Sequence, residues 1–321
     1  MRLPNIRRFF QRGSTFCPKL WDEVYIHDNG TVYTCCHEKP QALGNIYRDR
    51  MADLWNGELL QRLRQDSLRG RLGCYHDCTL LKKEEITPEP KPLSVPYSEL
   101  RRIKILFGEG CNISCIMCPQ NHRSRAHLDE QKLIENLDLA PFERIELQGG
   151  EPLFIMAARR FFDHATSQGK KVSFLTNGII INDEWAEKIA RHSSFVYFSL
   201  NAATKEMHEL VNRGSKWERV LRNIQRVRTA RDAHGTDLRI VGHMTIVPEN
   251  VAEIPSFIRR YREFGFDAIN FGFDEGVPAY LKSALDPARR KQLAQEIQAA
   301  LAQSGDGATV NSLRLQLLGL V

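Results

Sequence analysis

Short apolar segments alternate with helical patterns through the central part of this 321-residue chain. Between the fourth and fifth segments, Val220, Ile224 and Val227 recur at the spacing of one helix face. The segments themselves have the apolar composition of strands, and they cover residues 101–107, 144–147, 172–175, 196–200, 238–241 with 244–247, and 269–273. Strands that alternate with helices imply right-handed crossovers and a parallel sheet. The pattern therefore predicts an α/β fold of six units, too few for a closed eight-fold barrel.

Prolines mark a boundary upstream of this region. Residues 83–98 contain four prolines among charged groups, at Pro88, Pro90, Pro92 and Pro96. Prolines at alternate positions cannot continue a helix and favour extended backbone, which is typical of a linker. The predicted order is a cysteine-rich module at 1–82, the Pro-rich linker at 83–98, the α/β region at 99–275, and a C-terminal helix and tail at 276–321.

The composition of the chain gives expectations about its cellular compartment and its binding partners. No apolar run approaches the roughly 18 residues that a membrane helix needs, and residues 1–13 are basic but lack the apolar stretch of a signal peptide. We therefore expect a cytoplasmic protein, in which eight cysteines indicate metal or redox chemistry rather than disulfides. The formal net charge is +6, but the arginine pairs are scattered over predicted helix faces. This scatter predicts neither a nucleic-acid partner nor a membrane partner.

Three cysteines follow the first predicted strand within eight residues, at Cys111, Cys115 and Cys118. Three thiolates suit a four-iron cube and leave one iron open to a non-protein ligand. Two other kinds of site have the same spacing: a zinc site with a distant fourth ligand, and a ferredoxin-like electron carrier.

Further segments at the ends of later strands narrow these alternatives. Gly149-Gly150-Glu151-Pro152 closes the second strand, Thr176-Asn177-Gly178 closes the third, and Ser199 and Asn201 close the fourth, with Arg213 downstream. Together with the cysteine spacing, these segments resemble the radical S-adenosylmethionine (SAM) superfamily. The resemblance covers about residues 100–275. It implies an open six-unit (β/α)6 partial TIM barrel with its chemistry at the carboxyl ends of the strands.

The resemblance also implies residue roles. Cys111, Cys115 and Cys118 would bind a [4Fe–4S] cluster whose open iron chelates SAM. The implied SAM-binding residues are Gly149, Gly150 and Glu151 toward the amino group, Thr176 and Asn177 at the strand end, Ser199 and Arg213 toward the carboxylate, and Asn201 toward the ribose or the substrate. One electron would then cleave SAM, and the deoxyadenosyl radical would abstract a hydrogen atom.

The upstream module has its own cysteine pattern. Asn29-Gly30 between apolar runs predicts a hairpin turn because glycine and asparagine accept positive φ. The module resembles the twitch or SPASM modules of radical SAM enzymes, which hold an auxiliary [4Fe–4S] cluster. Its implied ligands are Cys17, Cys35, Cys74 and Cys78, and Cys36 is left as a buried thiol, an alternative ligand or a hydrogen-atom donor. A zinc site is the alternative.

The predicted function is that of a radical SAM oxidoreductase or transferase with SAM and two [4Fe–4S] clusters. Its reductant would be flavodoxin or ferredoxin. No separate leader-peptide-binding domain is seen, and this favours a small-molecule substrate: a sugar, nucleoside or aminocyclitol that is oxidised, epimerised or given sulfur in natural-product or cofactor biosynthesis. Radical modification of a ribosomal peptide is the first alternative, and a non-enzymatic two-cluster electron-transfer protein is the second.

Overall fold

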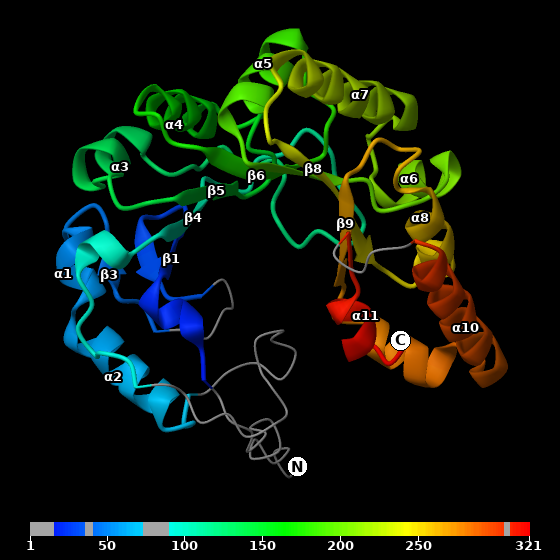
Figure 1. Ribbon diagram of the computed structural model, residues 1–321, viewed down its shortest axis with the longest axis horizontal. Coiled ribbons are helices and arrows are strands. Elements are labelled where there is room, and N and C mark those ends of the chain that lie inside the picture. The colour runs from blue at the N-terminus through cyan, green and yellow to red at the C-terminus, as the bar shows by residue number, and fades with distance from the viewer. Residues whose placement is uncertain (1–15, 36–40, 73–89, 305–308) are drawn as a thin grey trace. The chain divides into compact units, whose positions relative to one another are not determined.

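The computed structural model describes residues 16–35, 41–72, 90–304 and 309–321. The chain divides into two compact units, Met1–Phe107 with His127–Glu146, and Gly108–Ala126 with Leu147–Val321. Figure 1 shows the helices and strands of each unit. In the described part of the chain, no helix is both long enough and apolar enough to cross a membrane.

The first unit is built around a small mixed sheet. Its strands are β1 (Glu23–Ile26), β2 (Thr31–Tyr33), β3 (Gly44–Asn45), β4 (Arg102–Leu106) and the larger part of β5 (Arg144–Gln148). β1 pairs antiparallel with β2 and parallel with β4. The predicted turn is confirmed, because Gly30 joins β1 to β2 with a φ of +81°. The helical segments are η2 (Pro18–Trp21), α1 (Met51–Trp55), α2 (Glu58–Leu68), η3 (Tyr97–Glu99) and α3 (Glu130–Asn136).

The described end of the predicted linker packs against this unit. The Trp21 indole donates to the carbonyl oxygen of Pro92 at 2.7 Å, and the Asn56 side chain bonds both the N–H and the carbonyl of Val95. Because β1 pairs with β4, the strand that follows the linker joins the same sheet as the upstream hairpin. Sequence composition marked this stretch as a boundary, but its hydrogen bonds attach residues 92–95 to the upstream segment.

The second unit carries a parallel sheet in the order β10-β9-β8-β7-β6. Its strands are β6 (Val172–Thr176), β7 (Phe195–Ser199), β8 (Arg239–Ile246), β9 (Ala268–Phe273) and β10 (Val310–Asn311). Neighbouring strands pair in parallel throughout this set. The six predicted strands correspond to β4–β9, and β10 was not predicted. The expectation of an α/β fold with a mostly parallel sheet is therefore confirmed.

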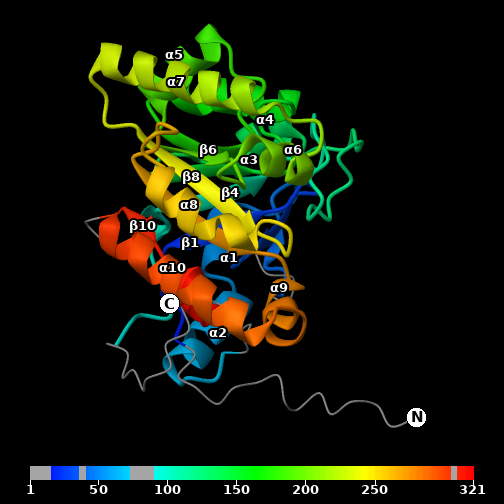
Figure 2. The same cartoon turned by 90° about the vertical axis from the view of Figure 1, so that its right-hand side faces the viewer.

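Helices of the second unit cover one face of its sheet. They are α4 (Met156–Ser167), α5 (Asp183–His192), α6 (Lys205–Val211), α7 (Trp217–His234), η4 (Val251–Glu253), α8 (Ile254–Arg260), α9 (Val277–Ala279), η5 (Tyr280–Ala284), α10 (Pro287–Gln303) and α11 (Leu313–Leu317). Figure 1 shows α5 and α7 side by side over β6 and β8, and Figure 2 shows α8 beside α10. Side chains at alternate strand positions, such as Phe198 and Ile240, are fully buried. The residues between them face the opposite side of the sheet.

Local signals in the sequence set the helix ends. Asn182, Thr204 and Asp286 each accept a backbone N–H in the first turn of the helix that follows them. Gly235 ends α7 with a φ of +59°, a conformation that glycine adopts without steric cost. These caps place the strand–helix loops, and the candidate site is built from those loops.

Arg64 is a buried cation that organises the first unit. Its side chain is 0% exposed, stacks 4.5 Å from the centre of the Trp55 ring, and donates to the carbonyl oxygens of Leu20 and Leu93 at 2.9 and 2.7 Å. Burial lowers the pKa of Arg64 to about 10, which leaves it charged at neutral pH. One side chain thus joins α2 to both the start of the unit and the linker.

We predict that Arg64→Ala lowers the free energy of unfolding by about 2–4 kcal/mol, because it leaves two buried carbonyl groups without donors. The matched control is Arg69→Ala, at an exposed position on the C-terminal side of the same helix, which should change stability by less than about 0.5 kcal/mol. Urea unfolding of both variants tests this. Equal stability of the two variants would contradict the role given to Arg64.

Candidate functional site

The cysteine loop of the second unit is held by backbone hydrogen bonds on both sides. The Cys111 N–H donates to the carbonyl of His122 at 3.0 Å, and the Ser114 N–H donates to the carbonyl of Arg213 at 2.9 Å. A third bond joins the Ile116 N–H to the carbonyl of Val211 at 3.0 Å. The loop geometry therefore depends on two segments that follow it by about ten and by about a hundred residues.

The three thiols of this loop are unpaired and close enough to influence one another. Burial, with smaller contributions from the neighbouring thiols, raises the pKa of Cys111 to about 11 and that of Cys115 to about 12. Cys118 is exposed. Three thiolates here need a bound positive centre, because a metal reverses the effect of burial on a thiol.

The donor set fits an iron–sulfur cube better than a single ion. Ligands of one zinc ion lie about 2.3 Å from it and hence close together. No group of three His, Cys, Asp or Glu side chains in the described ranges is placed to hold one metal ion. A structural zinc site uses four protein ligands, and this loop supplies three.

Gly150 lies in direct backbone contact with the cysteine loop. A Cβ atom at this position would lie 2.1 Å from the carbonyl oxygen of Gly110 and 2.4 Å from that of Glu109. Two hydrogen bonds close the contact, from the Gly150 N–H to Gly108 and from the Glu151 N–H to Gly110, at 2.8 and 2.9 Å. Only glycine leaves room for this approach.

Glu151 is buried beneath this contact. Its carboxylate is 1% exposed and accepts the Thr176 hydroxyl at 2.8 Å and the Asn177 N–H at 2.7 Å. Burial raises the pKa of Glu151 to about 7, against the effect of these donors. In the described residues the carboxylate has no ion pair, which fits a ligand that brings a positive charge, such as an ammonium group.

Asn177 links this carboxylate to the cysteines. Its side-chain amide donates to the Cys111 sulfur at 3.7 Å and to the Asn112 side chain at 2.8 Å. Hydrogen bonds to a ligating sulfur tune the reduction potential of an iron–sulfur cluster. The structure thus brings Thr176 and Asn177 to Glu151 and to the first cysteine.

The fourth strand end is arranged differently from the family expectation. Asn201 has a φ of +58°, is 2% exposed, and uses both ends of its side chain inside the protein, toward Asn212 at 2.8 Å and the Thr245 N–H at 2.7 Å. Ser199 is half-buried on β7, and Arg213 is exposed beside the cysteine loop. Asn201 therefore shapes this strand end through internal contacts, while Ser199 and Arg213 remain open to a ligand.

Sequence reasoning missed a polar row across the sheet. Ser199 on β7 lies opposite His243 on β8, and His243 lies opposite Asn270 on β9. All three point to the face of the sheet opposite α5 and α7, because they alternate with buried residues. The signal was present: His243 interrupts an apolar strand that the sequence analysis divided at this point, and Asn270 interrupts the next strand.

His243 is held in one orientation. Its Nδ1 lies 2.6 Å from the Asn270 amide oxygen and its Nε2 lies 3.2 Å from the Thr245 hydroxyl. A Cβ atom on Gly272 would approach the ring to 3.3 Å, so glycine leaves the space that the ring occupies. Burial lowers the pKa of His243, so the imidazole is neutral near pH 7. With Nδ1 as donor to Asn270, Nε2 is an acceptor.

The described part of the upstream module contains two of its predicted ligands. Cys17 and Cys35 are half-buried in the first unit, and the Cys17 N–H donates to the Ser67 hydroxyl at 2.8 Å. Cys36, Cys74 and Cys78 lie outside the described residues. Burial lowers the pKa of Arg102, but its hydrogen bonds to Asp22 outweigh this effect and raise the pKa, and Cys17 makes the smallest contribution.

Two family models match the chain in the regions just described. Residues 105–259 match the radical SAM superfamily, and residues 17–79 match the SPASM iron–sulfur cluster-binding domain. The chain therefore carries a radical SAM domain and a SPASM domain. The prediction that it is an enzyme is confirmed by this family and its enzyme-named relatives. The predicted cofactors are confirmed too: they are SAM and [4Fe–4S] clusters, with an auxiliary cluster in the SPASM region. The zinc alternative for the upstream module is therefore wrong.

Named relatives carry related domains. The chain is 26% identical over 161 residues to the mycofactocin maturase MftC of Mycobacterium tuberculosis, a match that covers 48% of this chain and 40% of MftC. It is 29% identical over 167 residues to the serine-type anaerobic sulfatase-maturating enzyme of Klebsiella aerogenes, covering 45% and 40%. The matches thus span about two fifths of the length of these curated relatives.

Among solved structures, Streptococcus suis SuiB bound to its precursor peptide SuiA aligns with a TM-score of 0.50 and 14% identity. The alignment covers 89% of this chain and 70% of SuiB, and it shows a shared fold. The prediction of a sugar, nucleoside or aminocyclitol substrate is wrong: the curated relatives are named as maturases, one of mycofactocin and one of a sulfatase. The small-molecule expectation relied on a segment that was not found rather than on any residue of the site.

We predict that Gly150→Ala displaces the glutamate segment from the cysteine loop, lowers the iron bound by that loop, and weakens SAM binding at least tenfold, equivalent to about 1.4 kcal/mol or more. Gly57→Ala is the control, because its Cβ would make only ordinary contacts of 3.4 Å or more at a φ of −61°. Iron analysis and equilibrium SAM binding on anaerobically reconstituted protein measure both effects. Normal SAM affinity in Gly150→Ala would contradict the contact described above.

Proposed function

We propose that this protein is a radical SAM maturase that modifies an amino-acid residue within a peptide. The observation that carries the proposal is the cysteine loop locked to the buried Glu151 segment, next to a sheet face with polar residues. The names of the relatives support a peptide as substrate. The alternative of a non-enzymatic electron carrier has no use for a buried carboxylate that needs a positive ligand.

Each group has a defined task in this proposal. Cys111, Cys115 and Cys118 hold a [4Fe–4S] cluster, which when bound supplies the electron that cleaves SAM. Asn177 fixes the first thiolate by its amide donor. Glu151 and the backbone of Gly149 and Gly150 orient the SAM ammonium group, and Ser199 with Arg213 bind the carboxylate by charge-assisted hydrogen bonds.

The polar row would face the peptide. Strands in a sheet lie about 4.8 Å apart, so His243 and Asn270 are one and two strand spacings from Ser199 at the same level. A peptide brings backbone N–H and carbonyl groups that need partners when water is excluded. The acceptor Nε2 of His243, which lies 3.2 Å from the Thr245 hydroxyl, would accept a peptide N–H in place of that hydroxyl and hold the reacting residue beside the SAM site.

The proposal also includes the finer architecture. β4–β9 would form the six-unit partial barrel, and the upstream hairpin with α1 and α2 would form the auxiliary module. Cys17, Cys35, Cys74 and Cys78 would hold the auxiliary [4Fe–4S] cluster, with Cys36 as an alternative ligand or hydrogen-atom donor. A flavodoxin or ferredoxin would supply electrons.

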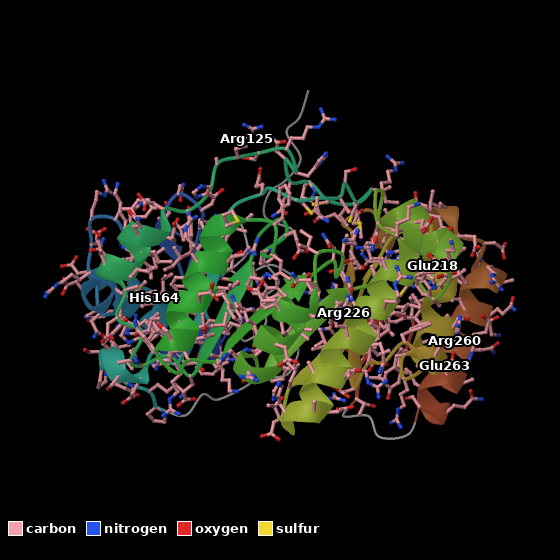
Figure 3. The ribbon with its side chains drawn as sticks, turned by 90° about the horizontal axis from the view of Figure 1, so that it is seen from above. Arg125, His164, Glu218, Arg226, Arg260 and Glu263 are labelled. Carbon is pink, nitrogen blue, oxygen red and sulfur yellow. The ribbon has the colours of Figure 1, made fainter. Side chains whose placement is uncertain are left out.

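Incubation of the reduced protein with SAM and with any short peptides that are encoded beside its gene tests the proposal. Formation of 5′-deoxyadenosine together with a mass change in one peptide is expected. We predict that His243→Ala retains 5′-deoxyadenosine formation without peptide but lowers peptide modification about tenfold or more, because the mispositioned peptide uncouples the two products. His164→Gln, on the outward helix α4 labelled in Figure 3, is the control.

Two results would count against this account in different ways. No 5′-deoxyadenosine from the reconstituted parent would reject radical SAM activity. Abundant 5′-deoxyadenosine with every neighbouring peptide unchanged in mass would reject the peptide substrate. A normal ratio of modified peptide to 5′-deoxyadenosine in His243→Ala would remove His243 from the substrate contact.

A further inference from the structure

An exposed apolar surface lies directly beside the cysteine loop. Phe154 and Met156 are 49% and 52% exposed, although most large apolar side chains of the described residues are buried. Both follow Glu151 closely in the chain, where Phe154 ends the glycine–glutamate segment and Met156 begins α4. Exposed aromatic and methionine side chains that lie together mark an interaction site more often than a solvated surface.

Cationic side chains surround these two residues. A Cβ atom built on Gly110 would lie 2.9 Å from the Ser124 carbonyl oxygen and 3.9 Å from the Phe154 ring, so the loop around Ser124 lies next to Phe154. That loop carries the exposed Arg123 and Arg125, and Arg125 is labelled in Figure 3. A third cation, Arg159, donates to the Met156 sulfur at 3.5 Å. We call these five residues, Phe154, Met156, Arg123, Arg125 and Arg159, the Phe154 surface.

Some arginines of this unit are neutralised by a carboxylate, and the two loop arginines are not. Arg226 and Arg260, also labelled in Figure 3, are paired with Asp183 and Glu263. Within the described part of the chain, Arg123 and Arg125 have no ion-pair partner. The acidic residue of this stretch, Glu109, is half-buried and accepts the Asn121 N–H at 3.2 Å. The exposed rim of the Phe154 surface is therefore positive.

A single hydrogen bond joins the loop of Arg123 to Cys111, a proposed ligand of the cluster. The carbonyl of His122, between Asn121 and Arg123, accepts the backbone N–H of Cys111. Cys118 is itself exposed. A centre docked on the Phe154 surface would therefore lie close to the thiolates, and electron transfer requires this proximity.

We propose that the Phe154 surface docks an acidic one-electron carrier protein of the flavodoxin or ferredoxin type and is the electron entry to the cluster. This inference rests on the proposed function, because that function requires an electron at the cluster. The arginines attract the acidic partner over a distance and Phe154 with Met156 form the small apolar centre. Weak, fast, salt-sensitive complexes with small interfaces are typical of electron carriers.

Stopped-flow reduction of the cluster, with flavodoxin hydroquinone as the donor, tests the docking surface. The variant is Arg123→Glu/Arg125→Glu, and the charge-matched control is Arg259→Glu/Lys291→Glu on α8 and α10, at exposed positions away from the cysteine loop. At low ionic strength we expect the second-order rate constant to fall at least about tenfold in the variant and to lose its salt dependence. The control should keep both.

Photoreduced deazariboflavin, a small uncharged reductant, provides the reference. Reduction of the cluster by this reagent should be equal in parent, variant and control. Should Arg123→Glu/Arg125→Glu lose its cluster, Arg123→Gln/Arg125→Gln replaces it. Its rate constant for reduction by flavodoxin is then expected to lie below that of the parent. Phe154→Ser should slow reduction by flavodoxin with the salt dependence kept.

Several results would overturn the proposal. These are a parent-like flavodoxin rate in the variant, an equal loss in the control, or reduced peptide modification in deazariboflavin-driven reactions with unchanged flavodoxin rates, which would assign the surface to the substrate. Cluster reduction is read by absorbance and does not require SAM cleavage. Failure of the proposed function, seen as no 5′-deoxyadenosine, is therefore separate from failure of the docking surface.

Discussion

The close contact between two glycine-containing backbones is the constraint on which the site depends. Gly150 leaves no space for a side chain against the carbonyl groups of Gly110 and Glu109. This contact fixes the cysteine loop relative to Glu151, and the carboxylate then accepts hydrogen bonds from the third strand end. Thiolates, carboxylate and strand ends are thus one hydrogen-bonded body, which is the kind of preorganisation that radical chemistry needs.

This hydrogen-bonded set of residues borders two proposed binding surfaces, the polar row with His243 and the Phe154 surface. On one side, Asn177 and Ser199 lead to the polar row with His243, which faces the proposed peptide. On the other side, the hydrogen bond from the Cys111 N–H to the His122 carbonyl joins the cysteine loop to the positive loop, where the proposed electron carrier docks. Substrate and electron would therefore reach the cluster from different sides, so that each can be changed by mutation without loss of the other.

Sequence patterns predicted the strands and the cysteine loop because those signals are local. The loop motifs also indicated the family, because each motif lies at the end of a predicted strand. The internal hydrogen bonds of Asn201 could not be predicted from the sequence, because its partners Asn212 and Thr245 are 11 and 44 residues away in the chain. His243 was missed because its role depends on cross-strand register and on the space left at Gly272. The small-molecule prediction failed because no residue had supported it.

The most direct test of the central claim is iron and sulfide analysis with EPR on reconstituted parent and on a Cys111→Ala/Cys115→Ala/Cys118→Ala variant. About eight irons in the parent and about four in the variant are expected, since each cubane holds four. The variant should keep one reducible cluster and form no 5′-deoxyadenosine. A variant that loses all its iron, or that still cleaves SAM, would contradict the assignment of two clusters and of the SAM-cleaving role to this loop.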